Sequence, residues 1–504
     1  MKQCAFRLAF AALLIAAVSL SGYGQGTSSS LSGVVVDQSG GVIPGADVTV
    51  KNEDTGAEFK TVTTDNGTFS IPALPPGMYT ATVSVPNFKQ AVIREIKLIA
   101  GTPATIRAVM QVGGSSETVV VQAGAEIVQS QTANITTTLV SSQITNLPLA
   151  TRNVMDFIAM LPGVSTTGSV RNSTVNGLPS VTINITIDGV NTQDNYNRNG
   201  DGFFSYISPR LDAMEEVTVS TATPGAESAG QGAVQIKFVT RSGNNNYTGS
   251  LYWYHRDPSL NTNYWFNNRD RAPLYKGDPG KWQNCTAAQL QNEFDKCKAG
   301  HDRYLLNQFG GRVGGPISIP GLFSGKDRAF FFVNYEEFRL PNQMTRTKNL
   351  YNPATENGIF RYTVGSTVRE VDLLNLAAAN GQTSTIDPTV QSVLATVRAS
   401  TSQGSLNDQT DPNYQYFYFT NSGGQRRVYP TVRLDFNLTS RHRLEGSWNY
   451  SSYDSSPDFL NNVDYPFPGS DNYGTQGGPR WQATAALRST LTPRIVNEAR
   501  IGLT

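Results

Sequence analysis

The C-terminal half of the chain alternates apolar and polar residues over long runs. In TVRLDFNLT, residues 431–439, one face of an extended strand carries Val432, Leu434, Phe436 and Leu438, and the other carries Arg433, Asp435 and Asn437. The run WQATAALRSTL, residues 481–491, repeats the scheme. Successive side chains of a strand point to opposite faces, so both runs predict strands with one apolar and one polar face. No stretch beyond residue 20 approaches the roughly 20 apolar residues of a spanning helix, so a membrane-embedded fold requires a closed barrel of strands.

The connections between these strands favour such a barrel over a half-buried soluble sheet, which also alternates. Tight turns near residues 440 and 493 contrast with long polar connections over residues 341–424 and 454–478, a pattern typical of outer-membrane barrels. The aromatic residues fit either interface girdles or an ordinary core: Tyr252, Trp253, Tyr254, Phe330, Phe331, Phe332, Trp448 and Tyr450. The candidate strands span residues 249–256, 303–318, 328–340, 426–439, 443–453, 480–491 and 495–504.

These strands are too few to close a large barrel, because barrels with a filled lumen close with ~22 strands. Each backbone group left unpaired in lipid costs several kcal/mol. We therefore expect the sequence to be an N-terminal part of a longer chain.

Length and composition predict several β-rich domains. A chain of 504 residues exceeds one ordinary core, and its charged fraction of 16% lies below the roughly 25% of typical soluble domains. The net charge of +1 supplies no overall field for binding nucleic acid.

The first residues predict export. Lys2 and Arg7 precede a largely apolar stretch of thirteen residues from Leu8 to Leu20, and a cut near Gln25 follows. A retained anchor is the alternative, but this run is too short to span a membrane. We expect residues 1–24 to be a cleaved signal peptide, and the protein to be exported; the family resemblance described below implies that it resides in the outer membrane of a Gram-negative-type bacterium.

Cys285 and Cys297 are the only cysteines after the signal peptide. In an oxidising compartment they predict one local disulfide, with two free thiols as the alternative. A metal site is not expected here, because His301 is an isolated candidate ligand.

Residues 25–112 predict a small β-sandwich. LSGVVVDQSGGVIPGADVTV and TDNGTFSIPALPPGMYTATVSVPNF contain short strands with period-two alternation, separated by turn residues. These segments resemble the carboxypeptidase regulatory-like domain, a transthyretin-like sandwich grouped with carbohydrate-binding-like folds. A metallocarboxypeptidase requires a zinc site, and His255, His301 and His442 do not show paired-ligand spacing. We therefore expect a non-enzymatic module without metal.

The mixture of short strands and one helical stretch, around Arg152 to Leu161, predicts a small α+β unit over residues 113–245. The ordered motifs LPLATRNVMDFIAMLPGV, VNGLPSVTINITIDGV, LDAMEEVTVSTATPGAESAGQGAVQIKFVTRSGNNNYTGSLYWYHRD and NYWFNN are similar to the plug and first barrel strand of TonB-dependent outer-membrane receptors of the Oar-like subfamily. The resemblance implies a mainly β protein: an N-terminal sandwich, an α+β plug, and the first part of a transmembrane antiparallel barrel over residues 246–504.

The resemblance also implies partners and a mechanism. ETVVV resembles the TonB box, the extended segment that contacts TonB, with an ordinary strand as the alternative; its residues are Glu117, Thr118, Val119, Val120 and Val121. The implied partners are TonB, outer-membrane lipid and a small extracellular ligand of the saccharide or siderophore kind, whose import draws energy transmitted by TonB. No cofactor is expected.

The stretch VNGLPSVTINITIDGVNTQDN, residues 175–195, breaks its alternation at Asp188-Gly189. Asp188 is a candidate metal ligand, catalytic acid or turn residue, and Asp and Gly both suit a turn. Asn195, Asn197, Asn199 and Gly200 mimic a calcium loop, but Tyr206 stands where a bidentate Glu is needed. We predict a plug turn, with possible ligand contacts from Asn176, Gly177, Asp188, Gly189, Asn191, Asp194 and Asn195.

No Ser-His-Asp order, phosphate-binding loop or dinucleotide fingerprint is present, so no catalytic residues are predicted. Two other classes of protein stay open. One is a non-transporting surface adhesion or carbohydrate-binding protein built on the same barrel, and the other is a secreted zinc carboxypeptidase.

Overall fold

The computed structural model describes residues 28–114, 118–122, 135–146, 151–166, 173–194, 196, 204–222, 234–260, 262, 282–283, 298–299, 305–492 and 495–504. The predicted signal peptide and the cysteine pair therefore lie outside the described residues. None of the described helices has the length and apolar character needed to cross a membrane.

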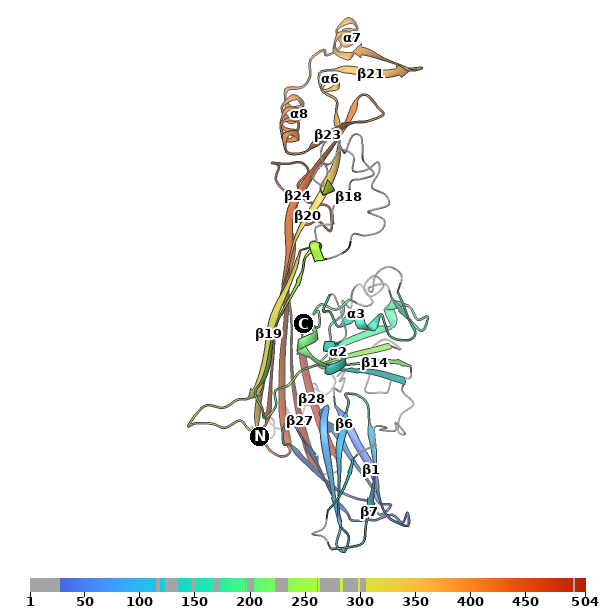
Figure 1. Cartoon of the computed structure of the whole chain (residues 1–504), viewed down its shortest axis with the longest axis vertical. Helices are drawn as coiled ribbons and strands as arrows, with labels where there is room; N and C mark the ends of the chain where they lie inside the picture. Colours follow the sequence, from blue (N-terminus) through green and yellow to red (C-terminus); the bar gives the residue numbers. More distant parts are fainter. Residues whose placement is uncertain are drawn as a thin grey trace, which may run out of the picture.

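The N-terminal part is a sandwich of two sheets, drawn in blue in Figure 1. One sheet has the order β4-β1-β7 and the other β3-β2-β5-β6-β8. Alternate residues point between the sheets, as Val48 and Val50 of β2 show by their complete burial. The strands are β1 Ser29–Asp37, β2 Asp47–Asn52, β3 Glu58–Val62, β4 Thr68–Leu74, β5 Gly77–Ser84, β6 Gln90–Leu98, β7 Ala104–Met110 and β8 Thr118–Gln122.

The predicted plug is a mixed sheet of order β13-β12-β15-β14-β9. Every residue of β12 and β15 is buried, so both faces of these central strands are covered. Two short helices and a small hairpin complete the domain. Its elements are β9 Ile135–Val140, α2 Ser141–Asn146, α3 Met155–Ile158, β10 Val164–Ser165, β11 Thr174–Val175, η2 Ser180–Thr182, β12 Ile183–Ile187, β13 Val190–Asn191, η3 Leu211–Ala213, β14 Met214–Ala222 and β15 Val234–Thr240.

The C-terminal part is a tall antiparallel sheet, called here the barrel wall, whose main path is β16-β19-β20-β24-β26-β27-β28. The plug lies against one face of it and the sandwich extends below the plug (Figure 1). The wall strands are β16 Thr248–Arg256, β19 Leu306–Pro316, β20 Ala329–Tyr351, β23 Ser405–Asp408, β24 Tyr414–Val428, β25 Thr431–Asn437, β26 His442–Ser456, β27 Gln476–Thr492 and β28 Ile495–Leu503.

Small elements accompany the wall. They are η4 Pro258–Leu260, β17 Trp282–Gln283, β18 Lys298–Ala299, α6 Pro353–Glu356, β21 Ile359–Val364, β22 Thr367–Asp372, α7 Leu373–Ala379, α8 Pro388–Ser400 and η7 Thr401–Gln403. The segment from α6 to α8 caps the far end of the wall (Figure 1).

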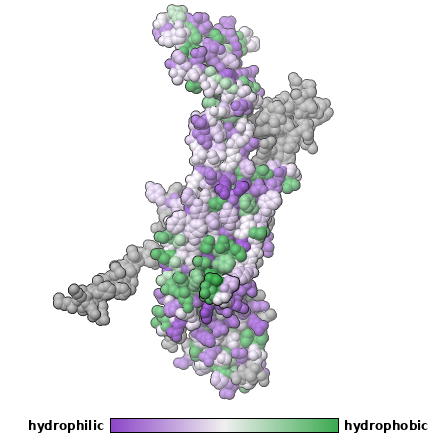
Figure 2. Space-filling view, turned by 90° about the vertical axis from the view of Figure 1, so that its left-hand side faces the viewer, coloured by the Kyte–Doolittle hydropathy of each residue, from purple (hydrophilic) through white to green (hydrophobic). Residues whose placement is uncertain are grey.

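Burial in the wall is the reverse of that in a soluble sheet. On β27 the polar residues Gln482, Thr484 and Arg488 are buried, while Trp481 and Leu487 are exposed. On β25, Arg433 and Asp435 are likewise buried and Leu434 is exposed. Figure 2 shows the outer face, where hydrophobic residues form a band between hydrophilic regions. A polar inner face and an apolar outer face are the arrangement of a transmembrane barrel.

Two features of the predicted strand limits are wrong. The predicted strand 426–439 is the end of β24 followed by β25, and Pro430 lies in the break because it has no N–H for the ladder. The connection predicted over residues 341–424 is shorter, because β20 continues to Tyr351 and pairs there with Tyr414 of β24. This extension is mostly polar on both faces, so it carries no regular alternation.

The strand β8 lies beyond the predicted sandwich limit at residue 112, yet it pairs with β6 of the sandwich. The domain limits 25–112, 113–245 and 246–504 stay predictions.

Candidate functional site

Asp188 occupies the turn between β12 and β13. Its φ of 49° and the φ of 78° at Gly189 place both residues in the left-handed region, which Asp tolerates better than most residues and Gly adopts freely. Asp188 Oδ1 accepts a hydrogen bond of 2.9 Å from the Thr240 backbone N–H, and Oδ2 accepts one of 2.6 Å from the Thr240 hydroxyl. The carboxylate therefore joins the turn to the end of β15.

The same carboxylate also reaches the barrel wall. The Ser447 hydroxyl donates to Asp188 Oδ2 at 2.6 Å, and Arg433 Nη1 lies 3.7 Å from Oδ1. Arg500 donates to the Asp188 backbone carbonyl. Asp188 is only 4% exposed, so it joins the plug to the wall through buried, charge-assisted contacts. We call this group the Asp188 contact.

A second buried ionic group, centred on Glu336 of β20, links the plug to the wall. Arg210 of the plug donates from Nε to Glu336 Oε1 at 2.6 Å, and Arg152 Nε lies 3.5 Å from Oε2. Tyr252 of β16 donates to Oε2 at 2.6 Å, and Asp212 of the plug pairs with Arg152. Since an unpaired charge in such a site is costly, each member depends on the others. We call this group the Glu336 cluster.

Aromatic rings of the wall enclose the arginines of the Glu336 cluster. The Arg152 guanidinium lies 4.3 Å from the ring centres of Tyr252 and Tyr254, and that of Arg210 lies 4.6 Å from Tyr429. Arg152 also has a φ of 54°, a conformation that costs energy for an arginine. The contacts of the Glu336 cluster thus stabilise the unfavourable backbone conformation of Arg152 at the surface of the plug.

Sequence reasoning did not identify the Glu336 cluster. The one available signal is Glu336 itself, a charged residue on the polar face of the strand AFFFVNYEEF. Its partners lie 126 and 184 residues away along the chain, beyond the reach of any local pattern.

The sandwich contacts the plug through a buried carboxyl group. The Ala100 backbone N–H, in the turn after β6, donates to Glu216 Oε1 of β14 at 2.6 Å. Among the described residues, Glu216 Oε2 has no hydrogen-bond partner. Burial raises the pKa of Glu216 to about 7, and the Ala100 N–H opposes part of this rise. The contact therefore includes a carboxyl group that titrates near neutral pH.

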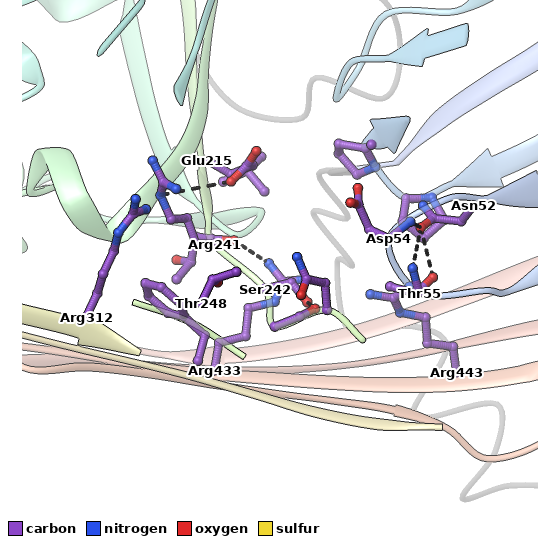
Figure 3. Close-up of a pocket in the computed structure, with 18 of the residues that line it drawn as sticks. Asn52, Asp54, Thr55, Glu215, Arg241, Ser242, Thr248, Arg312, Arg433 and Arg443 are labelled. Carbon is purple, nitrogen blue, oxygen red and sulfur yellow. Dashed lines mark hydrogen bonds and ion pairs between the residues drawn. The ribbon is translucent and has the colours of Figure 1, made fainter. Parts of the chain in front are cut away.

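A polar cavity of about 280 Å³ lies where the sandwich, plug and wall meet. Figure 3 shows Asn52, Asp54 and Thr55 of the sandwich opposite Glu215 of the plug strand β14 and Arg241, which directly follows β15. Arg312, Arg433 and Arg443 of the wall lie below them. Burial, and then the charge of Glu215, raises the pKa of Asp54. The Asn245 N–H donates to the Asp54 carbonyl at 3.0 Å, so the segment between plug and wall is fixed to the sandwich at this junction.

Within the described part of the chain, no three His, Cys, Asp or Glu side chains gather as metal ligands. His255 and His442 lie on wall strands, where their Nδ1 atoms are 2.9 Å from Asn307 Oδ1 and Ser489 Oγ.

Sequence families match all three parts of the chain. Residues 239–504 match the family described as outer membrane beta barrel domain, residues 128–235 the TonB-dependent receptor plug domain, and residues 30–111 the carboxypeptidase regulatory-like domain. The first match alone covers more than half of the 504 residues.

The chain belongs to the TonB-dependent outer-membrane receptors.

This receptor is similar to the TonB-dependent transporter Oar of Myxococcus xanthus, with 25% identity over 337 residues, 64% of this chain and 28% of that protein. The chain thus spans less than a third of the length of that relative. A crystal structure of a ferric enterobactin receptor mutant from Pseudomonas aeruginosa has 10% identity and a TM-score of 0.37, covering 73% of this chain and 40% of that one. The siderophore receptor PirA from Acinetobacter baumannii has 11% identity and a TM-score of 0.32, covering 73% and 47%.

The predicted TonB-contact segment of the receptor is an ordered strand in its described part. Thr118, Val119, Val120 and Val121 belong to β8, which pairs in parallel with β6 from Gln90↔Thr118 to Arg94↔Gln122. Glu117 lies outside the described residues. The TonB-contact role of these residues stays a prediction.

The predicted ligand contacts of the receptor fall into two places. Asp188, Gly189, Asn191 and Asp194 share one turn region, where Asn191 Nδ2 donates to Asn184 Oδ1 at 2.6 Å and Asp194 Oδ1 accepts from the Tyr196 N–H at 2.9 Å. Asn176 and Gly177 form a separate exposed turn after β11, with φ of 50° and 74°. Asn195 lies outside the described residues. The ligand-contact role stays a prediction, and Asp188 and Asn191 have internal structural contacts as well.

Proposed function

We propose that the full-length protein is a TonB-dependent transporter in the outer membrane, exported by a cleaved signal peptide. It would bind a small extracellular ligand of the saccharide or siderophore class and import it through the plugged barrel. TonB, contacting residues 117–121, would transmit the energy. We propose no catalytic step and no cofactor.

The observation that carries this proposal is the attachment of the plug to the inner face of the wall. The Asp188 contact and the Glu336 cluster are both buried and ionic. Such contacts hold a domain in one position, and loss of one partner leaves unpaired buried charges. A plug attached in this way can be moved as a unit when work is supplied, which a permanently packed apolar core would resist.

The first test is binding of the periplasmic domain of TonB to the full-length receptor in detergent. Replacing Thr118–Val121 by Gly-Ser residues of equal number should abolish binding. The same replacement at the exposed turn of residues 38–41, in the same sandwich, is the matched control and should leave binding intact. Absence of binding by the unaltered receptor contradicts the proposal and supports a surface adhesion protein.

Two further measurements bear on the other classes of protein. The full-length protein should fractionate with the outer membrane, and recovery in a soluble fraction contradicts the proposal. Metal analysis should find less than stoichiometric zinc, and one zinc per chain would support a carboxypeptidase.

A further inference from the structure

The outer edge of β8 is an interaction surface. We propose that TonB adds a strand to this edge while β8 stays paired with β6, so that the sandwich, β8 and TonB form one continuous sheet. This inference rests on the proposed function and extends it by giving the sandwich the role of presenting the TonB-contact segment.

The first observation is that β8 is an ordered edge strand. One of its edges is paired with β6 over five residues, and among the described residues no strand pairs with its other edge. Val120 is 52% exposed and Thr118 is also exposed. A strand in this position offers a row of unpaired N–H and C=O groups to an incoming strand.

The second observation is that β8 has none of the features that usually protect an edge. Its sequence is TVVVQ, which contains no charged residue and no proline and has a high preference for strand structure. The opposite edge of the same sheet is β3, with the sequence EFKTV. There Glu58 and Lys60 are exposed and lie 3.9 Å apart. One edge of this sheet is therefore protected by charge, whereas the other carries no charge and pairs with no described strand.

Pairing with β6 also prepares the segment for binding. A free segment loses backbone entropy when it becomes extended on a partner, and this loss opposes binding. In β8 the pairing with β6 has already fixed the extended conformation. TonB thus meets a preorganised strand with one edge that no described strand occupies.

The sandwich that holds β8 is attached to the rest of the receptor. Ala100, two residues after β6, contacts Glu216 of the plug at 2.6 Å. Arg488 of β27 donates to the Pro72 carbonyl at 3.2 Å. A pull on β8 in its sheet therefore acts on a module that contacts both plug and wall.

A disulfide lock tests whether β8 stays in place. Val92 of β6 is the register partner of Val120, so the Val92→Cys/Val120→Cys variant would join the two strands when oxidised. The full-length oxidised variant should bind the TonB periplasmic domain within about twofold of its reduced form. Binding that is lost on oxidation and restored on reduction overturns the inference, because TonB would then have to displace β8. Ala91→Cys/Val119→Cys, at the neighbouring register, is the second lock.

A charge placed on each edge tests which edge TonB uses. Val120 on β8 and Val62 on β3 have matched exposures of 52% and 53%. Val120→Lys should weaken TonB binding by about fivefold or more, whereas Val62→Lys should change it by less than about twofold, since a lysine on an edge opposes strand addition. Equal effects of the two changes overturn the inference.

These outcomes separate the inference from the proposed function. If the unaltered receptor does not bind TonB, the proposed function fails. If it binds TonB but the oxidised locks do not, the function stands and only the presentation of β8 fails.

Discussion

Replacing Asp188 by asparagine distinguishes the two roles of this residue, because it keeps the turn and weakens the contact to the wall. Asn adopts a φ of 49° as readily as Asp does, so the turn is kept. The substitution removes the charge and converts one carboxylate oxygen into an NH₂ group. The hydroxyls of Thr240 and Ser447, both 2.6 Å from Oδ2, then lose their charged acceptor.

The magnitude follows from these contacts. A hydrogen bond to a charged group contributes roughly 1.5–3 kcal/mol. The substitution weakens the two bonds from the Thr240 and Ser447 hydroxyls, but both hydroxyls stay next to a polar group of the asparagine. Arg433 keeps Asp435 and Glu445 as partners, which limits the cost. We expect opening of the plug turn to become easier by about 3 kcal/mol, or about a hundredfold in the opening equilibrium.

Hydrogen exchange of the full-length receptor in detergent measures this change. In Asp188→Asn, the amides of Thr240 and of neighbouring β15 residues should exchange about a hundredfold faster than in the unaltered protein, provided exchange follows the opening equilibrium. The control is Asn176→Asp, at an exposed plug turn with a φ of 50°, where exchange should change by less than about threefold. Exchange in Asp188→Asn within about twofold of the unaltered protein would show that Asp188 is only a turn residue.

Three further predictions concern other parts of the receptor. Glu336→Gln leaves Arg152 with Asp212 and, among the described residues, leaves Arg210 without a carboxylate partner, so it should destabilise the plug by about 3 kcal/mol or more in thermal unfolding. Glu337→Gln next to it removes a carboxylate that is also buried, but its partners Arg339 and Arg426 are exposed and stay solvated, so this change should cost about 1–2 kcal/mol; equal costs would contradict the role of the cluster. The pKa of Glu216 is raised from 4.5 to about 7, so between these values the folded protein keeps a proton that the unfolded chain releases, and the free energy of unfolding should fall by about 3 kcal/mol between pH 4.5 and 7. Glu216→Gln, whose side-chain oxygen can still accept from the Ala100 N–H, should remove this pH dependence from unfolding curves measured across that range; the same pH dependence in the variant would contradict the assignment to Glu216. Gly33→Ala places a Cβ atom 2.5 Å from the Ile106 carbonyl oxygen and should destabilise the sandwich by about 1–3 kcal/mol without shifting the unfolding of the barrel; a sandwich that unfolds at the same temperature would refute this close packing.

The wall strands were predictable because lipid and lumen impose opposite requirements on alternate residues. Leu434 faces outward and Arg433 inward, and the apolar and the charged residue are adjacent in the sequence, so the two faces can be recognised from it. Where β20 continues toward Tyr351, both faces are mostly polar, so the same reasoning placed a loop there. The turn at Asp188-Gly189 was predictable for a similar reason, since it depends on the conformations of two adjacent residues.

The contacts between domains were not predictable from local sequence. Asp188 meets Ser447 across 259 positions of the chain, and Ala100 meets Glu216 across 116. Each residue on its own is compatible with a solvated loop or strand end, and only the packing of the domains shows its partner. The pairing of β8 with β6 is of the same kind, because any sheet edge accepts an extended TVVVQ segment.

Cysteine trapping in cells tests the central claim most directly. Single cysteines at each position from Thr118 to Val121 of the full-length receptor would be combined with single cysteines along the interacting strand of TonB. We predict disulfide-linked receptor–TonB products from these positions and none from Val62→Cys on the opposite edge of the sandwich. No linked product from any position in β8, or equal products from Val62→Cys, would contradict the assignment of this protein as a receptor that contacts TonB through this strand.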